Sequence, residues 1–208
     1  MLPGSLSRAL AGLIGRFQAE ADARGLQAAL VLARALAGGA AAGLSHDQTT
    51  GASNGAAQWA CKGGLTDALL DTLAELGSPP PRGKGAPPPP PGAMGLYYGH
   101  RTDVLAGLAC LAYDSAEVAR RVEERGAVEL MLSQCQVDDG SPLTREWGLF
   151  AVRNLCEASS TLRDHIRGMK AQGVVQTEEI DRLGLKVEID PEGKVVVRKA
   201  MMPYEVRK

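Results

Sequence analysis

The chain has 208 residues, a formal net charge of −1 and 4% aromatic residues. The balanced charge argues against a protein whose main role is to hold nucleic acid, and the scarce aromatics argue against a platform that stacks single-stranded bases. The length suffices for one large domain or two small ones with a buried core. No run of about 18 apolar residues occurs, so no membrane-spanning helix is expected. These properties favour a protein that binds neither nucleic acid nor a membrane.

Residues 1–77 are predicted to form a degenerate helical segment. Apolar residues at helical spacing indicate a first helix between Leu6 and Phe17. Similar patterns predict helices over 25–37 and 63–76, on either side of a Gly- and Ala-rich loop at 38–55. Residues 1–18 also contain two arginines, two serines and no acidic residue, a composition that suits an organelle transit peptide. Organelle targeting by this stretch therefore stays open as a minor alternative.

Residues 78–95 are predicted to be a Pro-rich linker. Five consecutive prolines, Pro87 to Pro91, favour polyproline II and exclude a helix. A partner that recognises polyproline could bind here, but no well-placed flanking arginine distinguishes such a motif. We interpret the segment as a passive spacer.

After the linker, residues 96–173 are predicted to form a helical domain. Apolar periodicity indicates helices over 101–113, 115–122, 127–137, 144–158 and 160–169, with Ser115 as an N-cap. A repeat with a period of 44 residues aligns Arg101 with Arg145, Leu105 with Leu149, Leu111 with Leu155 and Ser115 with Ser159. A long helix followed by a short one at this period is typical of armadillo or HEAT solenoids, which bind proteins along an extended surface. We therefore expect an all-α, armadillo- or HEAT-like helical solenoid.

Residues 174–208 are predicted to contain a cap helix, a small β-hairpin and a tail. Leu185, Val187 and Ile189 alternate with charged residues, and a second apolar run spans 194–198. The sequence Asp190-Pro-Glu-Gly193 between them suits a tight turn.

The sequence offers no constellation for catalysis or cofactor binding. No phosphate-binding, dinucleotide, zinc-protease or nucleophile-elbow motif occurs. Asp138 and Asp139 supply too few oxygen ligands for calcium, so we expect them to end one helix and cap the next. The four cysteines lack metal-ligand spacing and are interpreted as buried small side chains. We expect neither an enzyme nor a metal- or cofactor-binding protein.

The helix expected at 144–158 carries the candidate binding residues. Leu149, Val152, Leu155 and Cys156 share one side, which we assign to the core. The candidates on the opposite side are Trp147, Phe150, Asn154 and Glu157, within roughly 80° of one another. An aromatic residue and an Asn four positions apart match the ladder with which armadillo proteins hold an extended peptide. The alternative is that the aromatic residues pack on a neighbouring repeat.

One stretch resembles a known family. Residues 132–155 begin Leu-Ser-Gln-Cys, carry the acidic pair at 138–139 and continue with Arg-Glu-Trp at 145–147. This pattern resembles the C-terminal domain of the ataxin-10 family, as do Tyr98–Asp103 and the segment from Gly173 to Glu188. The resemblance covers roughly residues 96–200. The sequence departs from the family pattern at Ser141, where Asn is usual, and at Phe150, where Trp is common.

The resemblance implies an armadillo-like, non-enzymatic scaffold for protein–protein interactions. The family is associated with cytokinesis, basal bodies and cilia in the cytoplasm. A regulatory subunit that docks on a partner enzyme is the alternative function that the sequence leaves open.

The N-terminal end is expected to lack a polar cap. Its first helix is apolar along one side and contains no acidic residue, whereas end repeats of solenoids carry a polar outer face. We therefore expect self-association through this end, in addition to other protein partners. Family members are longer at this end, which fits a truncated or degenerate N-terminal half.

Overall fold

A computed structural model describes residues 4–42, 60–80, 95–170, 173–174 and 178–199. The chain divides into two compact units, Met1–Arg163 and Asp164–Lys208. The Pro87–Pro91 run, most of the 38–55 loop and the end of the tail lie outside the described residues. The expectation of a mainly helical chain with a small C-terminal hairpin is confirmed.

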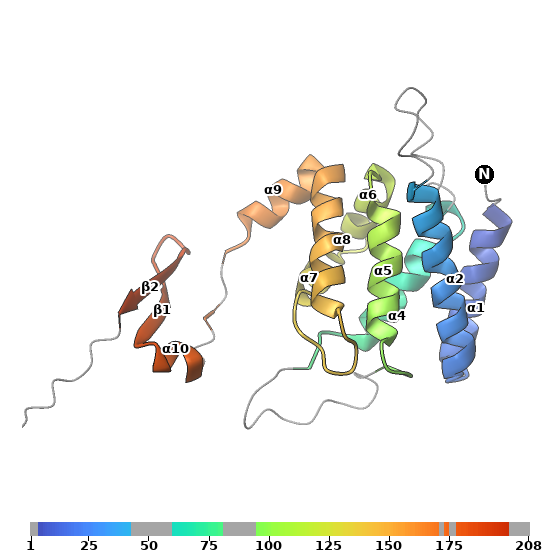
Figure 1. Cartoon of the computed structure of the whole chain (residues 1–208). Helices are drawn as coiled ribbons and strands as arrows, with labels where there is room; N and C mark the ends of the chain where they lie inside the picture. The colour runs from blue at the N-terminus through green and yellow to red at the C-terminus, as the bar shows by residue number, and fades with distance from the viewer. Residues whose placement is uncertain (1–3, 43–59, 81–94, 171–172, 175–177, 200–208) are drawn as a thin grey trace, which may run out of the picture. The chain divides into compact units, whose positions relative to one another are not determined.

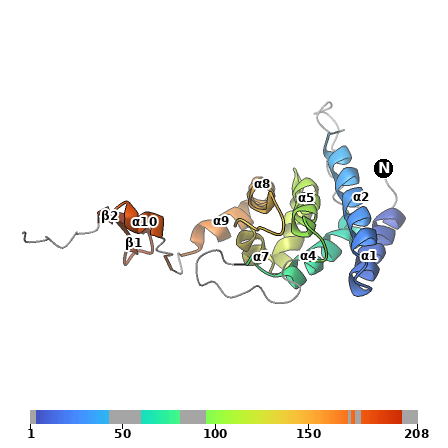
Figure 2. The same ribbon diagram turned by 60° about the horizontal axis from the view of Figure 1, so that its bottom comes forward.

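The first unit contains two layers of helices. Its elements are α1 (Gly4–Ala19), α2 (Ala23–Ala42), α4 (Leu65–Leu76), α5 (His100–Ala112), α6 (Ala116–Glu124), α7 (Val128–Ser133) and α8 (Thr144–Ala158). The helices α2, α5 and α8 lie side by side in one row, and α1 and α4 pack against this row (Figures 1 and 2). The helix α9 (Ser160–Gly168) follows α8 and contains the boundary between the units.

Leucines at helical spacing explain why the two layers hold together. Leu65, Leu69 and Leu73 of α4 are fully buried, as are Leu10 and Ile14 of α1. Leu105 and Leu108 of α5 are buried in the same core, between α2 and α8. Burial of one such side chain contributes about 1.5–3 kcal/mol, so this leucine core is the main source of stability.

The 44-residue repeat seen in the sequence also appears in the local backbone. Ser115 and Ser159 each accept a hydrogen bond from the amide three residues later, at 3.2 and 3.1 Å. Gly99 and Leu143, also 44 residues apart, precede α5 and α8 in the left-handed conformation, with φ of 93° and 65°. The predicted Ser115 cap is therefore confirmed, and the same caps recur one repeat later.

The second unit contains a short helix and a hairpin. The helix α10 (Glu178–Arg182) precedes β1 (Leu185–Ile189), which pairs antiparallel with β2 (Val195–Lys199). The expected turn is present: the Lys194 amide donates to the Asp190 carboxylate at 2.7 Å, and Gly193 has a φ of 82°. The pairs Val187–Val197 and Ile189–Val195 place apolar side chains on one face of the hairpin.

The largest departure from expectation concerns α7, predicted over 127–137 but confined to Val128–Ser133. After Ser133 the chain leaves the helix and places polar side chains in the interior of the protein. Gln134 and Asp138 from this segment, together with Ser141, surround the buried side chain and amide of Arg101. We call these four residues the arginine cluster.

The arginine cluster joins three segments that are distant in sequence. The Arg101 Nε atom lies 2.8 Å from the Asp138 carboxylate, and both side chains are almost fully buried. Its terminal nitrogens donate to Gln134 Oε1 at 2.8 Å and to the carbonyl oxygens of Leu76 and Gly77 at the end of α4. Burial lowers the pKa of the Arg101 guanidinium, and Asp138 opposes that shift. Arg101 therefore ties the end of α4 to α5 and to the loop after α7.

Asp138 consequently does not cap α8, as the sequence had suggested. One of its carboxylate oxygens accepts the amide of Gly140 at 2.8 Å, and the other is bound by Arg101. The N-cap of α8 is Leu143, which provides no side-chain cap. The buried charge of Arg101 is a stronger attraction for the carboxylate than an exposed helix end.

Replacing Arg101 by Met should destabilise the protein by about 3–5 kcal/mol, because Asp138 would be left buried and unpaired. Arg145→Met is the matched control: Arg145 is the exposed equivalent one repeat later, and its change should stay within about 0.5 kcal/mol. Urea unfolding followed by circular dichroism measures both. Equal stabilities for the two variants would contradict a structural role for the cluster.

Gly148 should tolerate no side chain, because α8 passes close to the end of α7. A Cβ there would lie 2.8 Å from the carbonyl oxygen of Gln134. We expect Gly148→Ala to destabilise by about 1–3 kcal/mol, despite the better helix propensity of Ala. A Cβ added at Gly12 in α1 would meet no other atom within 4 Å, so Gly12→Ala should stabilise the protein by about 0.5–1 kcal/mol. Thermal unfolding of both variants tests the pair, and a Gly148→Ala protein as stable as the wild type would refute the close approach.

Candidate functional site

The predicted binding residues of α8 do not all reach the surface. Phe150 is 39% exposed, Glu157 is exposed, and Trp147 is half-buried. Asn154 is only 2% exposed, and its amide donates to the carbonyl oxygen of Ala109 in α5 at 2.9 Å. The expected position of Asn154 on the outer face was wrong: this side chain joins α8 to α5 and cannot hold a peptide.

The reason is that α8 packs through small side chains. Its buried face consists of Thr144, Gly148, Ala151, Asn154 and Leu155. This face is centred away from Leu149, which was assigned to the core but is 52% exposed. The sequence did contain a signal, since Gly148 and Ala151 are three residues apart and allow neighbouring backbones to approach closely.

Three apolar residues remain together on one edge of α8. Leu143 is 60% exposed at the helix start, and its carbonyl oxygen accepts the amide of Trp147, one turn later. The Trp147 and Phe150 rings meet edge to face, with centroids 5.9 Å apart at 67°. Glu157 lies beyond them and pairs with Arg153 at 2.9 Å. We call Leu143, Trp147 and Phe150 the aromatic patch.

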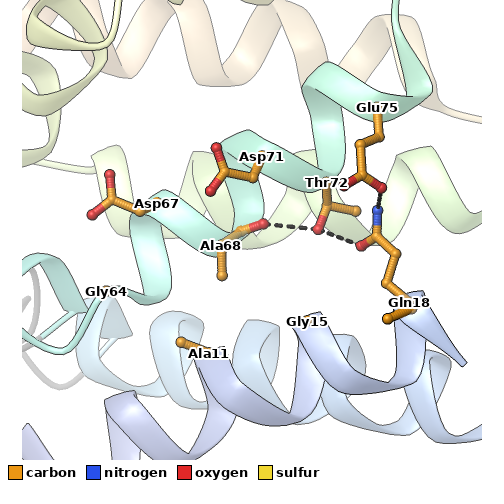
Figure 3. Close-up of a pocket in the computed structure, with 10 residues that line it drawn as sticks. Ala11, Gly15, Gln18, Gly64, Asp67, Ala68, Asp71, Thr72 and Glu75 are labelled. Carbon is orange, nitrogen blue, oxygen red and sulfur yellow. Dashed lines mark hydrogen bonds between the residues drawn. The ribbon is translucent and has the colours of Figure 1, made fainter.

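A groove of about 440 Å³ lies between α1 and α4 (Figure 3). Asp67, Asp71 and Glu75 of α4 line one side, and Ala11 and Gly15 of α1 line the other. These acidic residues already have partners. Asp67 binds Arg121 of α6 at 2.8 Å, Asp71 binds Arg125, and Glu75 accepts the Gln18 amide (Figure 3). The acidic row therefore joins α4 to its neighbours.

Among the described residues, His100 is the one whose buried side chain has an unsatisfied hydrogen-bonding atom. Its Nδ1 atom accepts the amide of Leu96 at 3.2 Å, and its ring stacks on Tyr97, with centroids 4.9 Å apart. His100 is 1% exposed, and its Nε2 atom has no hydrogen-bond partner in the part of the chain that the structure describes. Burial, assisted by the charge of Arg101, lowers the pKa of His100 to about 4. The ring is therefore neutral at physiological pH and carries its hydrogen on Nε2.

The cysteines and metal-ligating residues offer no further chemistry in the described part of the chain. All four cysteines are half-buried, and burial raises the pKa of Cys61, Cys110 and Cys135. Among the described residues, no group of three or more His, Cys, Asp or Glu side chains could hold a metal ion. None of the described helices is both long and apolar enough to cross a bilayer.

The buried neutral state of His100 should make the protein less stable in acid. The unfolded chain binds a proton near pH 6.5, whereas the folded chain does so only near pH 4. Stability should therefore fall by up to about 3 kcal/mol between these values. His100→Gln should remove this part of the pH dependence, and the exposed His165→Gln should retain it. Urea midpoints across this range measure the effect, and identical pH profiles for the two variants would contradict it.

Comparison with known proteins places this domain in a family. A model of the spinocerebellar ataxia type 10 protein domain matches residues 100–198, which include α5, the arginine cluster, α8 and all but the last residue of the hairpin. No solved structure matches the chain.

Named relatives agree with this match. An ataxin-10 homolog of Dictyostelium discoideum is 31% identical over 97 residues, which are 47% of this chain and 16% of that protein. An ataxin-10 homolog of Saccharomyces cerevisiae is 30% identical over 92 residues, which are 44% of this chain and 16% of that protein. Ataxin-10 of Homo sapiens is 28% identical over 90 residues, which are 43% of this chain and 19% of that protein. The chain thus spans less than a quarter of the length of these relatives. Through the domain at residues 100–198, the chain belongs to the ataxin-10 family.

Proposed function

We propose that this protein is a non-enzymatic scaffold for protein–protein interactions, built as an armadillo-like helical solenoid. The observation that carries the proposal is the aromatic patch on α8. Tryptophan and phenylalanine are enriched at the centres of protein interfaces and depleted from solvated surfaces. In this chain, with 4% aromatic residues, two of them lie edge to face on one exposed helix edge.

The repeat architecture supports the same proposal. The row α2–α5–α8 and the 44-residue recurrence of helix caps are the features that helical repeat proteins share. Such rows present extended surfaces on which a partner contacts several helices. A regulatory subunit that docks on an enzyme would use the same patch, and no contact in the structure favours it over a scaffold.

The setting of this function comes from the family. We infer a cytoplasmic protein that acts in assemblies such as those of cytokinesis or of basal bodies and cilia. Self-association through the N-terminal end stays a prediction, which light scattering of the whole chain can test.

Replacing Phe150 by Ala should abolish partner binding with little loss of stability. Because the ring is 39% exposed, we expect a cost below about 1 kcal/mol, against about 3–5 kcal/mol for a fully buried phenylalanine. Affinity purification from native lysate, quantified by mass spectrometry, compares the wild-type chain with this variant. Specific partners should be lost with Phe150→Ala.

The matched control is Leu149→Ala, an exposed apolar residue on the other edge of α8. Partners should be retained by this variant. Capture of the same proteins by the wild type and both variants would exclude the aromatic patch as the binding surface. A steep drop in melting temperature for Phe150→Ala would show instead that the ring is a core element.

A further inference from the structure

The aromatic patch of α8 contains a hydrogen-bond donor that the fold does not use. Trp147 is half-buried, and its indole Nε1–H donates to no acceptor in the part of the chain that the structure describes. Among the described residues, the one buried side-chain nitrogen or oxygen without a partner is His100 Nε2, so the Trp147 donor reaches solvent. Leu143 and Phe150 beside it are 60% and 39% exposed. The patch therefore presents two rings, a leucine and one N–H group.

The patch has no acceptor to match this donor. The side chains of Leu, Trp and Phe contain no acceptor atom. The carbonyl oxygens of an α-helix are used by its own amides, and the Leu143 carbonyl oxygen already accepts the Trp147 amide at 3.0 Å. A partner should therefore bring free carbonyl oxygens and few N–H groups, because an N–H group buried here would be left unsatisfied.

This requirement distinguishes between kinds of partner backbone. The carbonyl oxygens within a partner helix are bound internally and cannot accept from Trp147. A β-strand has free carbonyl oxygens, but it brings as many N–H groups, which the patch cannot satisfy. A polyproline II segment makes no internal hydrogen bonds, and each of its prolines has a carbonyl oxygen and no N–H group. Its backbone is the one that complements the patch.

The charges beside the patch indicate which residues should flank the prolines. Glu146 is exposed one turn before Phe150 and forms no ion pair with any described residue. Glu157 is already paired with Arg153 at 2.9 Å. Arg145 is also exposed, but it lies roughly 140° around the helix from Phe150. A negative charge thus remains available at the patch, which favours a basic residue in the partner.

We propose that the aromatic patch binds a proline-rich segment of a partner protein in the polyproline II conformation, with a Lys or Arg beside the prolines. In this complex the rings of Trp147 and Phe150 pack on proline rings, the Trp147 Nε1–H donates to a carbonyl oxygen, and Glu146 pairs with the basic residue. A polyproline II segment is already extended, so its binding costs little ordering entropy. This inference rests on the proposed function and specifies the chemistry of the partner.

Two fluorescein-labelled peptides test the proposal on the whole chain. One contains about ten prolines followed by a pair of arginines, and the other has alternating Gly and Ser in place of the prolines. Fluorescence anisotropy should show saturable binding of the proline peptide and at least about tenfold weaker binding of the Gly-Ser peptide. A chain with Ser at positions 87–91 is titrated beside the wild type, so that the chain's own prolines cannot mask the site.

Variants of α8 locate the site. Trp147→Phe keeps a ring but removes the donor, so it should weaken binding of the proline peptide about fivefold, as expected for one hydrogen bond. Phe150→Ala should weaken it by at least about tenfold, and Glu146→Gln should reduce its salt dependence. The control Leu149→Ala, on the other edge of α8, should bind like the wild type. Circular dichroism checks that each variant is folded.

The indole signal of Trp147 reports on the donor directly. The chain has two tryptophans, Trp59 and Trp147, so a nitrogen–proton NMR correlation spectrum should contain two indole signals. Trp147→Phe identifies the signal of Trp147. The proline peptide should shift this signal downfield, because the N–H group then donates to a carbonyl oxygen, and should leave the signal of Trp59 in place.

Other results would overturn the proposal. Equal binding of the two peptides, or binding of neither by either form of the chain, would exclude a proline-rich partner. An equal loss with Leu149→Ala, or an unchanged Trp147 signal, would place the site elsewhere. A dimer in sedimentation velocity that Phe150→Ala dissolves and the proline peptide does not would identify a second copy as the occupant. If lysate partners are lost with Phe150→Ala but the proline peptide does not bind, this inference fails while the proposed function stands.

Discussion

The Arg101 guanidinium determines how the helices before and after residues 81–94 fit together. Removing an arginine from water costs several kcal/mol, and this cost is met only when its donors are satisfied together. Here the partners are a carboxylate from the loop after α7, an amide oxygen from Gln134 and two carbonyl oxygens at the end of α4. A misaligned helix would leave a buried charge without a partner, so the cluster selects one arrangement of the three segments.

This constraint gives a physical meaning to the polar residues of the family-like stretch. Gln134, Asp138 and Ser141 stand in a segment that looks like a surface loop, yet all three are buried. They surround an arginine that precedes them by more than thirty positions. The first part of the family-like stretch is therefore largely internal framework, whereas its second part, from Leu143 onward, carries the exposed aromatic patch of α8.

Burial along the row of α2, α5 and α8 shows where exposed apolar surfaces arise. Leu105 and Leu149 occupy the same position of successive repeats, but Leu105 is covered and Leu149 is 52% exposed. The difference comes from the neighbours: within the first unit, α5 packs between α2 and α8, whereas α5 is the one described helix that packs extensively along α8. At the opposite end, the outer side of α2 is exposed for the same reason. In a row of repeats, the same sequence position is thus part of the core inside the row and exposed to solvent at its end.

Sequence periodicity predicted most helices, the Ser115 cap and the hairpin, because each depends on residues within a few positions. The buried face of α8 was not predicted. A helical wheel favours large apolar residues as core, whereas the close backbone of Gln134 requires the small Gly148, and Ala151 is buried on the same face. Asn154 was placed outside because its acceptor, the Ala109 carbonyl oxygen, lies in another helix. The arginine cluster was missed for the same reason: its members are brought together only by the tertiary fold.

The contacts between α4 and α5 also determine how this protein would respond to a break in its chain. Residues 81–94 separate these helices in sequence, but Leu76 and Gly77 are bound directly by Arg101, and Leu69 of α4 lies beside Gly107 of α5. A proteolytic cut between positions 81 and 94 therefore leaves two fragments that share one core. They should remain a non-covalent complex and reassemble when produced separately, as a split protein does. Connectivity through this segment is not what holds the first unit together.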